Sequence, residues 1–247
     1  MSTVTEQDLS SIDLADPALW DAGPPYELFA RLQREAPVHF SRQAVAPDEG
    51  GFWSITRHED VRAVTGRLDA LVSNAGVYRP GPLAQYSVGD WDFLFAVNTR
   101  ATWLLAKAAH QALKASRGAI VATGSMSGTN AHANLGAYGP SKAAVIMLVQ
   151  VLAQEFGRDG IRVNSVSPGM VRTGMTETVY RDAAVAAERD ALVPLGRVAT
   201  PEDMADVIAF LLGNDARYVN GHDLVVDGGV SGNFLGRLPG IAKIPRG

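Results

Sequence analysis

The sequence predicts an α/β protein whose parallel sheet is covered by helices on both faces. From Leu68 onward, short apolar runs alternate with long segments of helical periodicity, a pattern typical of parallel sheets with crossover helices. Each apolar run leads directly into a short polar or glycine-containing turn. The chain has 247 residues, of which 47% are hydrophobic and 19% charged, so it can bury a core of ordinary size.

The first 66 residues differ from the rest, because they are rich in proline, charge and turn signals. Apolar positions in Tyr26–Glu35 recur at helical spacing, and Pro37 ends that helix. Val38–Ser41 and Phe52–Thr56 are expected to be short strands on either side of a turn. Arg57–Val64 is a candidate for a short helix. We therefore expect a helix–hairpin–helix segment in front of the α/β region.

The α/β region contains four expected strands and three expected long helices. The strands are Leu68–Ser73, Gly118–Thr123, Ile161–Val166 and His222–Val226. The helices are Trp91–Leu113, Tyr138–Phe156 and Pro201–Leu212, the last with Thr200 as its N-cap. Proline at the first helical position after a threonine is a favoured helix start.

The composition excludes several kinds of site. The chain contains no cysteine, which rules out disulfides, thiolate zinc sites, iron–sulfur clusters and a haem held by a cysteine thiolate. A formal net charge of −4 and the lack of a basic run argue against nucleic acid as a partner. The five histidines have no metal-ligand spacing. Without a membrane-length apolar window or a secretory signal, we expect a cytoplasmic protein that binds neither membrane nor metal.

The strongest candidate site is the pair Tyr138 and Lys142, which stand four residues apart on one face of a helix. A phenol is a poor base at neutral pH, but a nearby ammonium favours the phenolate and lowers its pKa. Such a pair can exchange a proton with an alcohol or a carbonyl oxygen. Taken alone, this pattern favours the alternative of an ordinary helix with an exposed Tyr and Lys.

Two further polar residues accompany this pair. Ser125 follows the end of the Gly118–Thr123 strand, where open parallel sheets bind their ligands, and its hydroxyl can bond a substrate oxygen. It could instead only cap the next turn. Asn98 lies inside the first long helix, where asparagine is a mediocre helix former. It is either a residue that holds a water linking Lys142 to solvent or a solvent-facing polar residue.

Together these residues resemble the short-chain dehydrogenase/reductase family. The motifs that carry the resemblance are Asn74–Gly76, Asn98, Ser125, Tyr138 with Lys142, Ser167–Gly169 and Asp227–Gly229. The resemblance covers residues 68 to about 235 and implies a Rossmann-like doubly wound parallel sheet. It also implies hydride transfer between NAD or NADP and a secondary alcohol or ketone, in a homodimer or homotetramer packed through the two long helices.

The resemblance also implies a role for each site residue. Tyr138 is the acid/base, Lys142 lowers its pKa and holds the nicotinamide ribose, Ser125 positions the substrate oxygen, and Asn98 completes the proton relay. The cofactor would further contact Asn74, Ala75, Gly76, Pro168, Gly169, Val171 and Thr173. The segment from Gly174 to Val198 would be a mobile substrate loop. Met126, Met170, Met175 and Tyr180 are either an apolar substrate pocket or core.

The family's first strand–helix–strand block, with its glycine-rich phosphate loop, is not found in residues 1–67. Gly23, Gly50, Gly51 and Gly66 do not form that loop, and no residue indicates the choice between NAD and NADP. The main alternative is therefore an impaired or repurposed scaffold that binds dinucleotide weakly or not at all.

The N-terminal segment, about residues 12–66, resembles the N-terminus of bacterial cytochromes P450. The resemblance rests on Asp16–His39 and Gly51–Val64. Since the chain lacks cysteine, no haem chemistry follows from it, and a redox-partner module is a remote third interpretation. Residues 1–67 would be an appendage and 68–247 the dehydrogenase-like domain. A gene fusion, an engineered chimera or a mis-assembled one would explain this composition.

Loss of the first block would leave the Leu68–Ser73 strand with an open edge. We expect Phe52–Thr56 to pair with that edge, as part of a strand–helix–strand unit whose connection has about the minimum length for a parallel crossover. The tail after Gly229 could cover the pocket or reach a neighbouring subunit.

Overall fold

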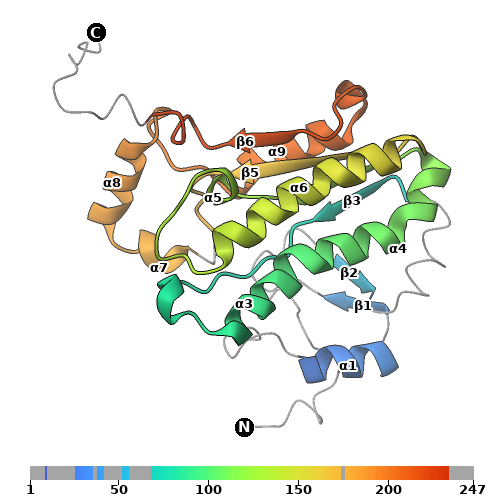
Figure 1. The fold of residues 1–247 in the computed structure, drawn as a ribbon, viewed down its shortest axis with the longest axis horizontal. Helices are drawn as coiled ribbons and strands as arrows, with labels where there is room; N and C mark the ends of the chain where they lie inside the picture. Colours follow the sequence, from blue (N-terminus) through green and yellow to red (C-terminus); the bar gives the residue numbers. More distant parts are fainter. Residues whose placement is uncertain are drawn as a thin grey trace. The chain divides into compact units, whose positions relative to one another are not determined.

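The computed structural model describes residues 9, 26–35, 38–41, 52–55, 68–173 and 176–233. The chain divides into two compact units, Met1–Gly66 and Arg67–Gly247 (Figure 1). In the first unit, helix α1 (Tyr26–Glu35) buries Leu28 and Leu32, which lie one turn apart. Strands β1 (Val38–Ser41) and β2 (Phe52–Ile55) form an antiparallel pair. The expected helix and hairpin are thus confirmed, whereas the expected helix Arg57–Val64 lies outside the described residues.

The predicted pairing of Phe52–Thr56 with Leu68–Ser73 is wrong. β2 pairs with β1 in a two-stranded sheet, and the other four described strands form a separate sheet. An antiparallel hairpin satisfies the backbone groups of β2 with a chain neighbour and needs no crossover, whereas a parallel pairing does need one. Within the described part of the chain, β3 (Ala70–Ser73) is therefore the edge strand of the larger sheet.

The larger sheet is parallel throughout, with strand order β3-β4-β5-β6. Its other strands are β4 (Ala119–Thr123), β5 (Arg162–Pro168) and β6 (Asp223–Val226). All four strands expected in this region are confirmed. β4 and β5 are buried almost throughout, as expected for central strands that are covered on both faces. The sheet is therefore that of a Rossmann-like fold.

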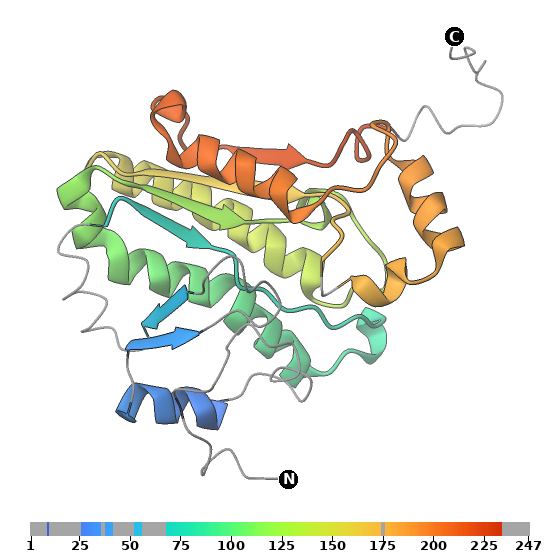
Figure 2. The same ribbon diagram turned by 180° about the vertical axis from the view of Figure 1, so that it is seen from behind.

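Helices cover both faces of this sheet. On one face, α4 (Ala101–Ser116) and α6 (Tyr138–Gly157) lie side by side, and on the other lies α9 (Pro201–Leu212) (Figures 1 and 2). The α4/α6 face packs around Ile120 and Val163, and the α9 face around Val121 and Val166. Adjacent strand residues point to opposite faces, so each central strand serves both cores.

The first long helix is not uniform. Its first part is α3 (Val88–Leu94), capped by Ser87, and a π-helical turn η5 (Phe95–Arg100) joins it to α4. π-turns are rare and occur mostly at functional sites. Asn98 lies within this turn and is buried, so its interpretation as a solvent-facing residue is wrong.

The segment expected to be a loop, Gly174–Val198, contains two helices in its described part. They are α7 (Glu177–Tyr180) and α8 (Ala183–Leu192). The Asp182 carboxylate caps α8 by accepting from the amides of Ala184 and Val185 at 2.9 and 3.3 Å. The remaining short elements are η4 (Leu83–Gln85), α5 (Met126–Thr129) and η6 (Asn214–Ala216).

Helix α9 is fixed at both ends by side chains. Thr200 and Asp203 form a capping box at its start, as predicted from Thr200, and Arg197 binds the Asp203 carboxylate with two hydrogen bonds of 2.6 and 2.7 Å. At its end, the Arg162 guanidinium donates to the carbonyls of Leu211, Leu212 and Gly213 at 2.6–3.1 Å. A guanidinium suits this position because the final carbonyls of a helix have no helical partner.

We expect Arg162→Met to lower the free energy of unfolding by about 1–3 kcal/mol, because three carbonyls lose a charged donor. Urea unfolding followed by circular dichroism measures this change. Arg158→Met, at an exposed position after α6, is the control and should change stability by less than about 0.5 kcal/mol. Equal stability of the two variants would contradict the capping role of Arg162.

Candidate active site

The carboxyl ends of β3, β4 and β5 open into a cavity of about 840 Å³. This is the edge of an open parallel sheet at which ligands bind. The cavity brings together, from segments far apart in sequence, all but one of the predicted site residues. Those that line it are Asn74, Ala75, Gly76, Ser125, Tyr138, Lys142, Pro168, Gly169, Val171 and Thr173. Asn98 is the exception: it does not line the cavity but binds Val77 and Ser141, which are chain neighbours of the lining residues Gly76 and Lys142.

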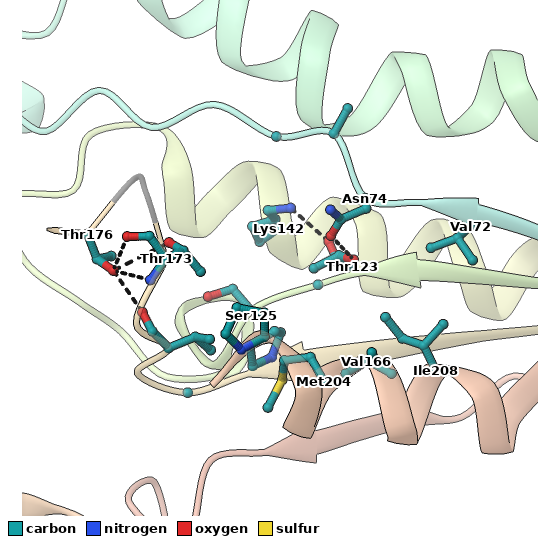
Figure 3. A pocket seen from close by; sticks show the side chains of 18 of the residues that line it. Val72, Asn74, Thr123, Ser125, Lys142, Val166, Thr173, Thr176, Met204 and Ile208 are labelled. Carbon is teal, nitrogen blue, oxygen red and sulfur yellow. Dashed lines mark hydrogen bonds between the residues drawn. The ribbon is translucent and has the colours of Figure 1, made fainter. Parts of the chain in front are cut away.

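Lys142 projects from the second turn of α6 and is only 3% exposed. Its ammonium donates a 2.7 Å hydrogen bond to the Thr123 carbonyl at the end of β4 (Figure 3). Burial lowers the pKa of Lys142 to about 8, because the charged form is poorly solvated there. One donor of the ammonium is thus used by the strand, and the others remain available beside the cavity.

Tyr138 is the first residue of α6, and its side chain also borders the cavity. Burial raises the pKa of its phenol, a hydrogen bond with Ser125 lowers it, and the Tyr78 phenol raises it. The net direction is upward, opposite to the lowering expected from Lys142. The Lys142 Nζ lies 5.9 Å from the Tyr138 ring centroid, and desolvation of the phenol outweighs its influence. Tyr138 is therefore held in its protonated form at neutral pH.

Ser125 occupies the turn between β4 and α5 and is buried. Its hydroxyl accepts a 3.1 Å hydrogen bond from the Ser127 amide, as an N-cap does. The same hydroxyl lies close enough to the Tyr138 phenol to lower the pKa of that phenol. The two interpretations of Ser125 are thus compatible, since the cap fixes the hydroxyl next to Tyr138.

The Asn98 side chain joins three segments. Its Oδ1 accepts from the Val77 amide at 2.8 Å, and its Nδ2 donates to the Val77 carbonyl at 3.1 Å and to the Ser141 hydroxyl at 2.9 Å. Both amide hydrogens are therefore committed to protein acceptors. Asn98 ties the loop after β3 to the first turn of α6, where Tyr138 stands.

The loop after β3 approaches the lysine closely. The Asn74 Oδ1 accepts a 2.9 Å hydrogen bond from the Thr123 hydroxyl (Figure 3). A Cβ at Gly76 would lie 3.3 Å from the Lys142 Nζ and 3.5 Å from the Asn98 Oδ1. A side chain at position 76 would therefore crowd the ammonium, which accounts for glycine there.

The end of β5 supplies another wall of the cavity. A Cβ at Gly169 would lie 2.6 Å from that of Asp227, so only glycine allows the chain to pass the turn after β6. The Thr176 hydroxyl accepts from the Thr173 amide at 3.0 Å and donates to the Val171 carbonyl at 2.8 Å. This local network shapes the backbone on which Val171 and Thr173 line the cavity. Figure 3 shows Thr173 beside Thr176.

Several residues of the site were not foreseen. Thr123, Thr176 and Met204 line the cavity, Ser141 binds Asn98, and Tyr78 packs on Tyr138 with ring centroids 5.7 Å apart. Three of them stand at positions that the sequence could have indicated. Tyr78 follows soon after β3, Thr123 ends β4, and Ser141 is next to Lys142 in the chain.

Of the residues that could form an apolar substrate pocket, Met126, Met170 and Tyr180 do not line the cavity. Met175 lies outside the described residues, as does the part of the C-terminal tail after residue 233. In the described part of the chain, no cluster of His, Asp or Glu could hold a metal. Nor does that part contain a helix long and apolar enough to cross a membrane.

Comparison with known proteins identifies the relatives of this chain. A family model described as enoyl-(acyl carrier protein) reductase matches residues 55–231. The mouse (3R)-3-hydroxyacyl-CoA dehydrogenase is 42% identical over 175 residues, covering 70% of this chain and 67% of that protein. The meso-2,3-butanediol dehydrogenase of Serratia marcescens is 36% identical, covering 70% and 68%. The rat (3R)-3-hydroxyacyl-CoA dehydrogenase is 43% identical, and this chain spans 62% of its length.

Solved structures agree with this result. The NADP and tartrate complex of gluconate 5-dehydrogenase from Burkholderia cenocepacia J2315 superposes with a TM-score of 0.67 at 30% identity, covering 71% of this chain and 69% of that one. A short-chain type dehydrogenase/reductase from Mycobacterium ulcerans gives a TM-score of 0.66 at 33% identity, covering 70% and 64%. The parallel sheet, the residues at its carboxyl edge and the family match agree, and the chain belongs to the short-chain dehydrogenase/reductase family.

Proposed function

We propose that this protein is an oxidoreductase that transfers a hydride between NAD(P) and a secondary alcohol or ketone. The observation that carries the proposal is the convergence of Tyr138, Lys142 and Ser125 on one cavity at the carboxyl edge of the sheet. The relatives are named dehydrogenases, which supports an enzyme over the alternative of an impaired scaffold.

The residues at the cavity fit the nicotinamide-ribose end of such a cofactor. Lys142 presents ammonium donors beside the close backbone approach at Gly76, which suits ribose hydroxyls. Pro168, Val171 and Thr173 form the wall that would face the nicotinamide. The cofactor, when bound, supplies or accepts the hydride. NADP is bound in the structures of the Burkholderia cenocepacia gluconate 5-dehydrogenase and of ElxO, and we infer that NADP or NAD serves here.

The protein's own residues would handle the proton. Tyr138, protonated because burial raises the pKa of its phenol, donates to the carbonyl oxygen during reduction and accepts the proton back during oxidation. Ser125 donates a hydrogen bond to the same oxygen and stabilises its developing negative charge. Lys142, with its ammonium beside the cavity, favours the phenolate that remains. Asn98 keeps the loop and α6 in place around this group and would complete the proton relay.

A substrate with an apolar body suits the rest of the cavity, since Met204 and Ile208 of α9 and Val166 of β5 contribute to its lining (Figure 3). The relatives are named for hydroxyacyl-CoA and butanediol, both of which carry secondary alcohols. We therefore propose a secondary alcohol or ketone as the substrate class.

We also propose that the protein assembles as a homodimer or homotetramer through α4 and α6. Trp103 and Leu104 on α4, and Met147 and Val151 on α6, are all exposed large hydrophobic residues on two adjacent helices. Exposed apolar side chains in such number indicate an interaction surface.

The cytoplasmic location, the likeness of residues 12–66 to cytochromes P450 and the appendage role of residues 1–67 remain predictions.

The proposed function is tested by titrating the protein with NADPH and NADH while following the fluorescence of the nicotinamide. Saturable binding with a dissociation constant below millimolar is expected for at least one of them. Substrate-dependent oxidation of that cofactor, screened over secondary alcohols and ketones, then establishes the activity. No saturable binding below millimolar concentrations of either cofactor would refute the proposal.

The pH dependence of ketone reduction should report Lys142. Its pKa is lowered to about 8, so the ammonium is lost above that pH while Tyr138, whose pKa is raised, stays protonated. We expect kcat/KM to be level below pH 8 and to fall above it by about tenfold per pH unit. Steady-state rates between pH 6 and pH 10 measure this. The guanidinium of Lys142→Arg does not lose its proton in this range, so any activity of this variant should not fall above pH 8. A fall above pH 8 in Lys142→Arg like that of the unaltered protein would contradict the assignment to Lys142.

A further inference from the structure

Tyr78 stands against the proposed acid/base but outside the set of residues assigned so far. Its ring meets that of Tyr138 edge to face, with ring centroids 5.7 Å apart and an interplanar angle of 88°. This is a preferred arrangement of two aromatic rings. Tyr78 is 42% exposed, so it contacts both Tyr138 and solvent.

The first turn of α6 offers the Tyr138 ring little support of its own. Tyr138 opens the helix, and Gly139 and Pro140 follow it. Gly139 has no side chain because a Cβ there would lie 2.8 Å from the Ser127 carbonyl oxygen. The orientation of the phenol therefore depends on contacts from other segments, of which the described ones are the Ser125 hydroxyl and the Tyr78 ring.

Tyr78 can serve as such a support because its backbone is held on both sides. Asn98 binds both the amide and the carbonyl of Val77, the preceding residue. Three residues after Tyr78, Gly81 donates from its amide to the Asn134 carbonyl at 2.9 Å and accepts from the Gly136 amide at 3.0 Å. The loop that carries Tyr78 is thus tied to η5 on one side and to the segment before α6 on the other.

We propose that Tyr78 is a positioning residue of this site, which holds the Tyr138 ring toward Ser125 and through which Asn98 acts on Tyr138. The chain of contacts runs from the Asn98 amide to the Val77 backbone, from there to the Tyr78 ring, and from that ring to the phenol. The kinetic part of this inference rests on the proposed function, whereas its structural part does not.

Two substitutions separate the aromatic edge from the hydroxyl. Tyr78→Phe keeps the ring that contacts Tyr138, and Tyr78→Leu removes it. Tyr218→Leu, at a fully exposed position, is the matched control for loss of a tyrosine. Circular dichroism and thermal melting establish that each variant is folded before it is compared.

The first measurement needs no turnover. Protein labelled with ¹³Cζ-tyrosine is titrated by NMR, and the Tyr138 resonance is assigned by its absence in Tyr138→Phe. Removal of the covering ring admits water, so Tyr78→Leu should move the raised pKa of Tyr138 back toward the ordinary phenol value of about 10 and shift its resonance. Tyr78→Phe keeps the ring and removes only the smaller contribution of the Tyr78 phenol, so its shift should be smaller than that of Tyr78→Leu. A Tyr138 resonance and titration unchanged in Tyr78→Leu would overturn the proposal.

The second measurement is kinetic. We expect Tyr78→Leu to lower kcat about tenfold, with the KM for cofactor unchanged, because the proton donor is misplaced while the cofactor wall is intact. Tyr78→Phe should retain kcat within about twofold. In a double-mutant cycle, Asn98→Ala and Tyr78→Leu should lower kcat by less than the product of their separate effects. Equal losses in Tyr78→Phe and Tyr78→Leu, or strictly multiplicative effects in the cycle, would overturn the proposal.

The two measurements distinguish the two proposals from each other. If the unaltered protein turns over no alcohol or ketone, the proposed function fails, and the NMR titration alone decides the role of Tyr78. If the protein is active and the NMR signal of Tyr138 is indifferent to Tyr78→Leu, the positioning role fails while the function stands.

Discussion

Tyr138→Phe is expected to lower kcat by about a hundredfold to ten-thousandfold, the usual contribution of a positioned general acid/base. The substitution removes only the hydroxyl that exchanges a proton with the substrate oxygen. Phenylalanine keeps the edge-to-face packing with Tyr78, so the surrounding structure should persist. The ribose-binding donors of Lys142 also persist, and the dissociation constant of the cofactor should change by less than about threefold.

Steady-state kinetics and a fluorescence titration of the same preparation measure these two quantities together. Tyr218→Phe is the matched control, because that phenol is fully exposed and its loss should leave both unchanged. Activity of Tyr138→Phe within tenfold of the unaltered protein would refute Tyr138 as the acid/base. A parallel loss of cofactor binding would mean that the hydroxyl acts mainly in holding the cofactor.

Lys142→Met is expected to abolish activity and yet to stabilise the fold at neutral pH. Lys142 is 3% exposed, and burial lowers its pKa from 10.5 to about 8. This shift corresponds to about 3 kcal/mol of unfavourable free energy for the charged form. Methionine has a similar volume and no charge, but it leaves the Thr123 carbonyl without its 2.7 Å hydrogen bond, a loss of about 1 kcal/mol. The net gain at pH 7 should be about 2 kcal/mol.

The pH dependence of this difference has a definite sign. Between pH 8 and pH 10.5, Lys142 is neutral in the folded protein and charged in the unfolded chain, so the unfolded chain binds more protons. The free energy of unfolding contributed by Lys142 therefore rises with pH through this window. The advantage of Lys142→Met should shrink over the same range and vanish at about pH 10, above which the missing hydrogen bond to Thr123 makes the variant the less stable protein.

Urea unfolding of both proteins at pH 7, 8.5 and 10 measures the effect, because other titrating groups are shared by the two and cancel to first order. Lys114→Met, at an exposed ion pair with Asp159, is a control that should not stabilise at any of these pH values. A stability difference for Lys142→Met that does not vary with pH would contradict the lowered pKa of Lys142.

The sequence predicts much of the architecture because periodicity records which faces are buried. The alternation of apolar runs and helices located the four strands of the larger sheet and the helices α4, α6 and α9. The carboxyl ends of parallel strands lie at the same edge of a sheet, and turn residues directly follow each strand. Asn74–Gly76, Ser125 and Pro168–Thr173 could therefore be placed at that edge. The spacing of Tyr138 and Lys142 requires only one helical turn to bring them to the same cavity.

Features that depend on tertiary packing were not accessible in the same way. The pKa of Tyr138 moves upward because the assembled fold excludes water from it, and spacing along a helix says nothing about that. The contact between Tyr78 and Tyr138 joins residues far apart in the chain. The expected pairing of β2 with β3 was wrong because a strand pattern does not identify every partner of a strand. The π-turn at Asn98 is a change in the hydrogen-bond register of the helix, and neither the composition nor the periodicity of the segment indicates it.

The π-turn at Phe95–Arg100 also affects how this chain can be altered. An extra residue in one turn displaces everything after it by one position, which is about 100° of rotation around the helix axis. α3 and α4 thus present their apolar sides in two different phases, and no single helical wheel describes both. Deleting one residue from this segment would rotate the helix on one side of the deletion by about 100°. Either Asn98 would then turn away from Val77, or Ala106 and Leu113 would turn out of the core. In this segment, the chain should therefore tolerate a substitution better than a deletion or an insertion.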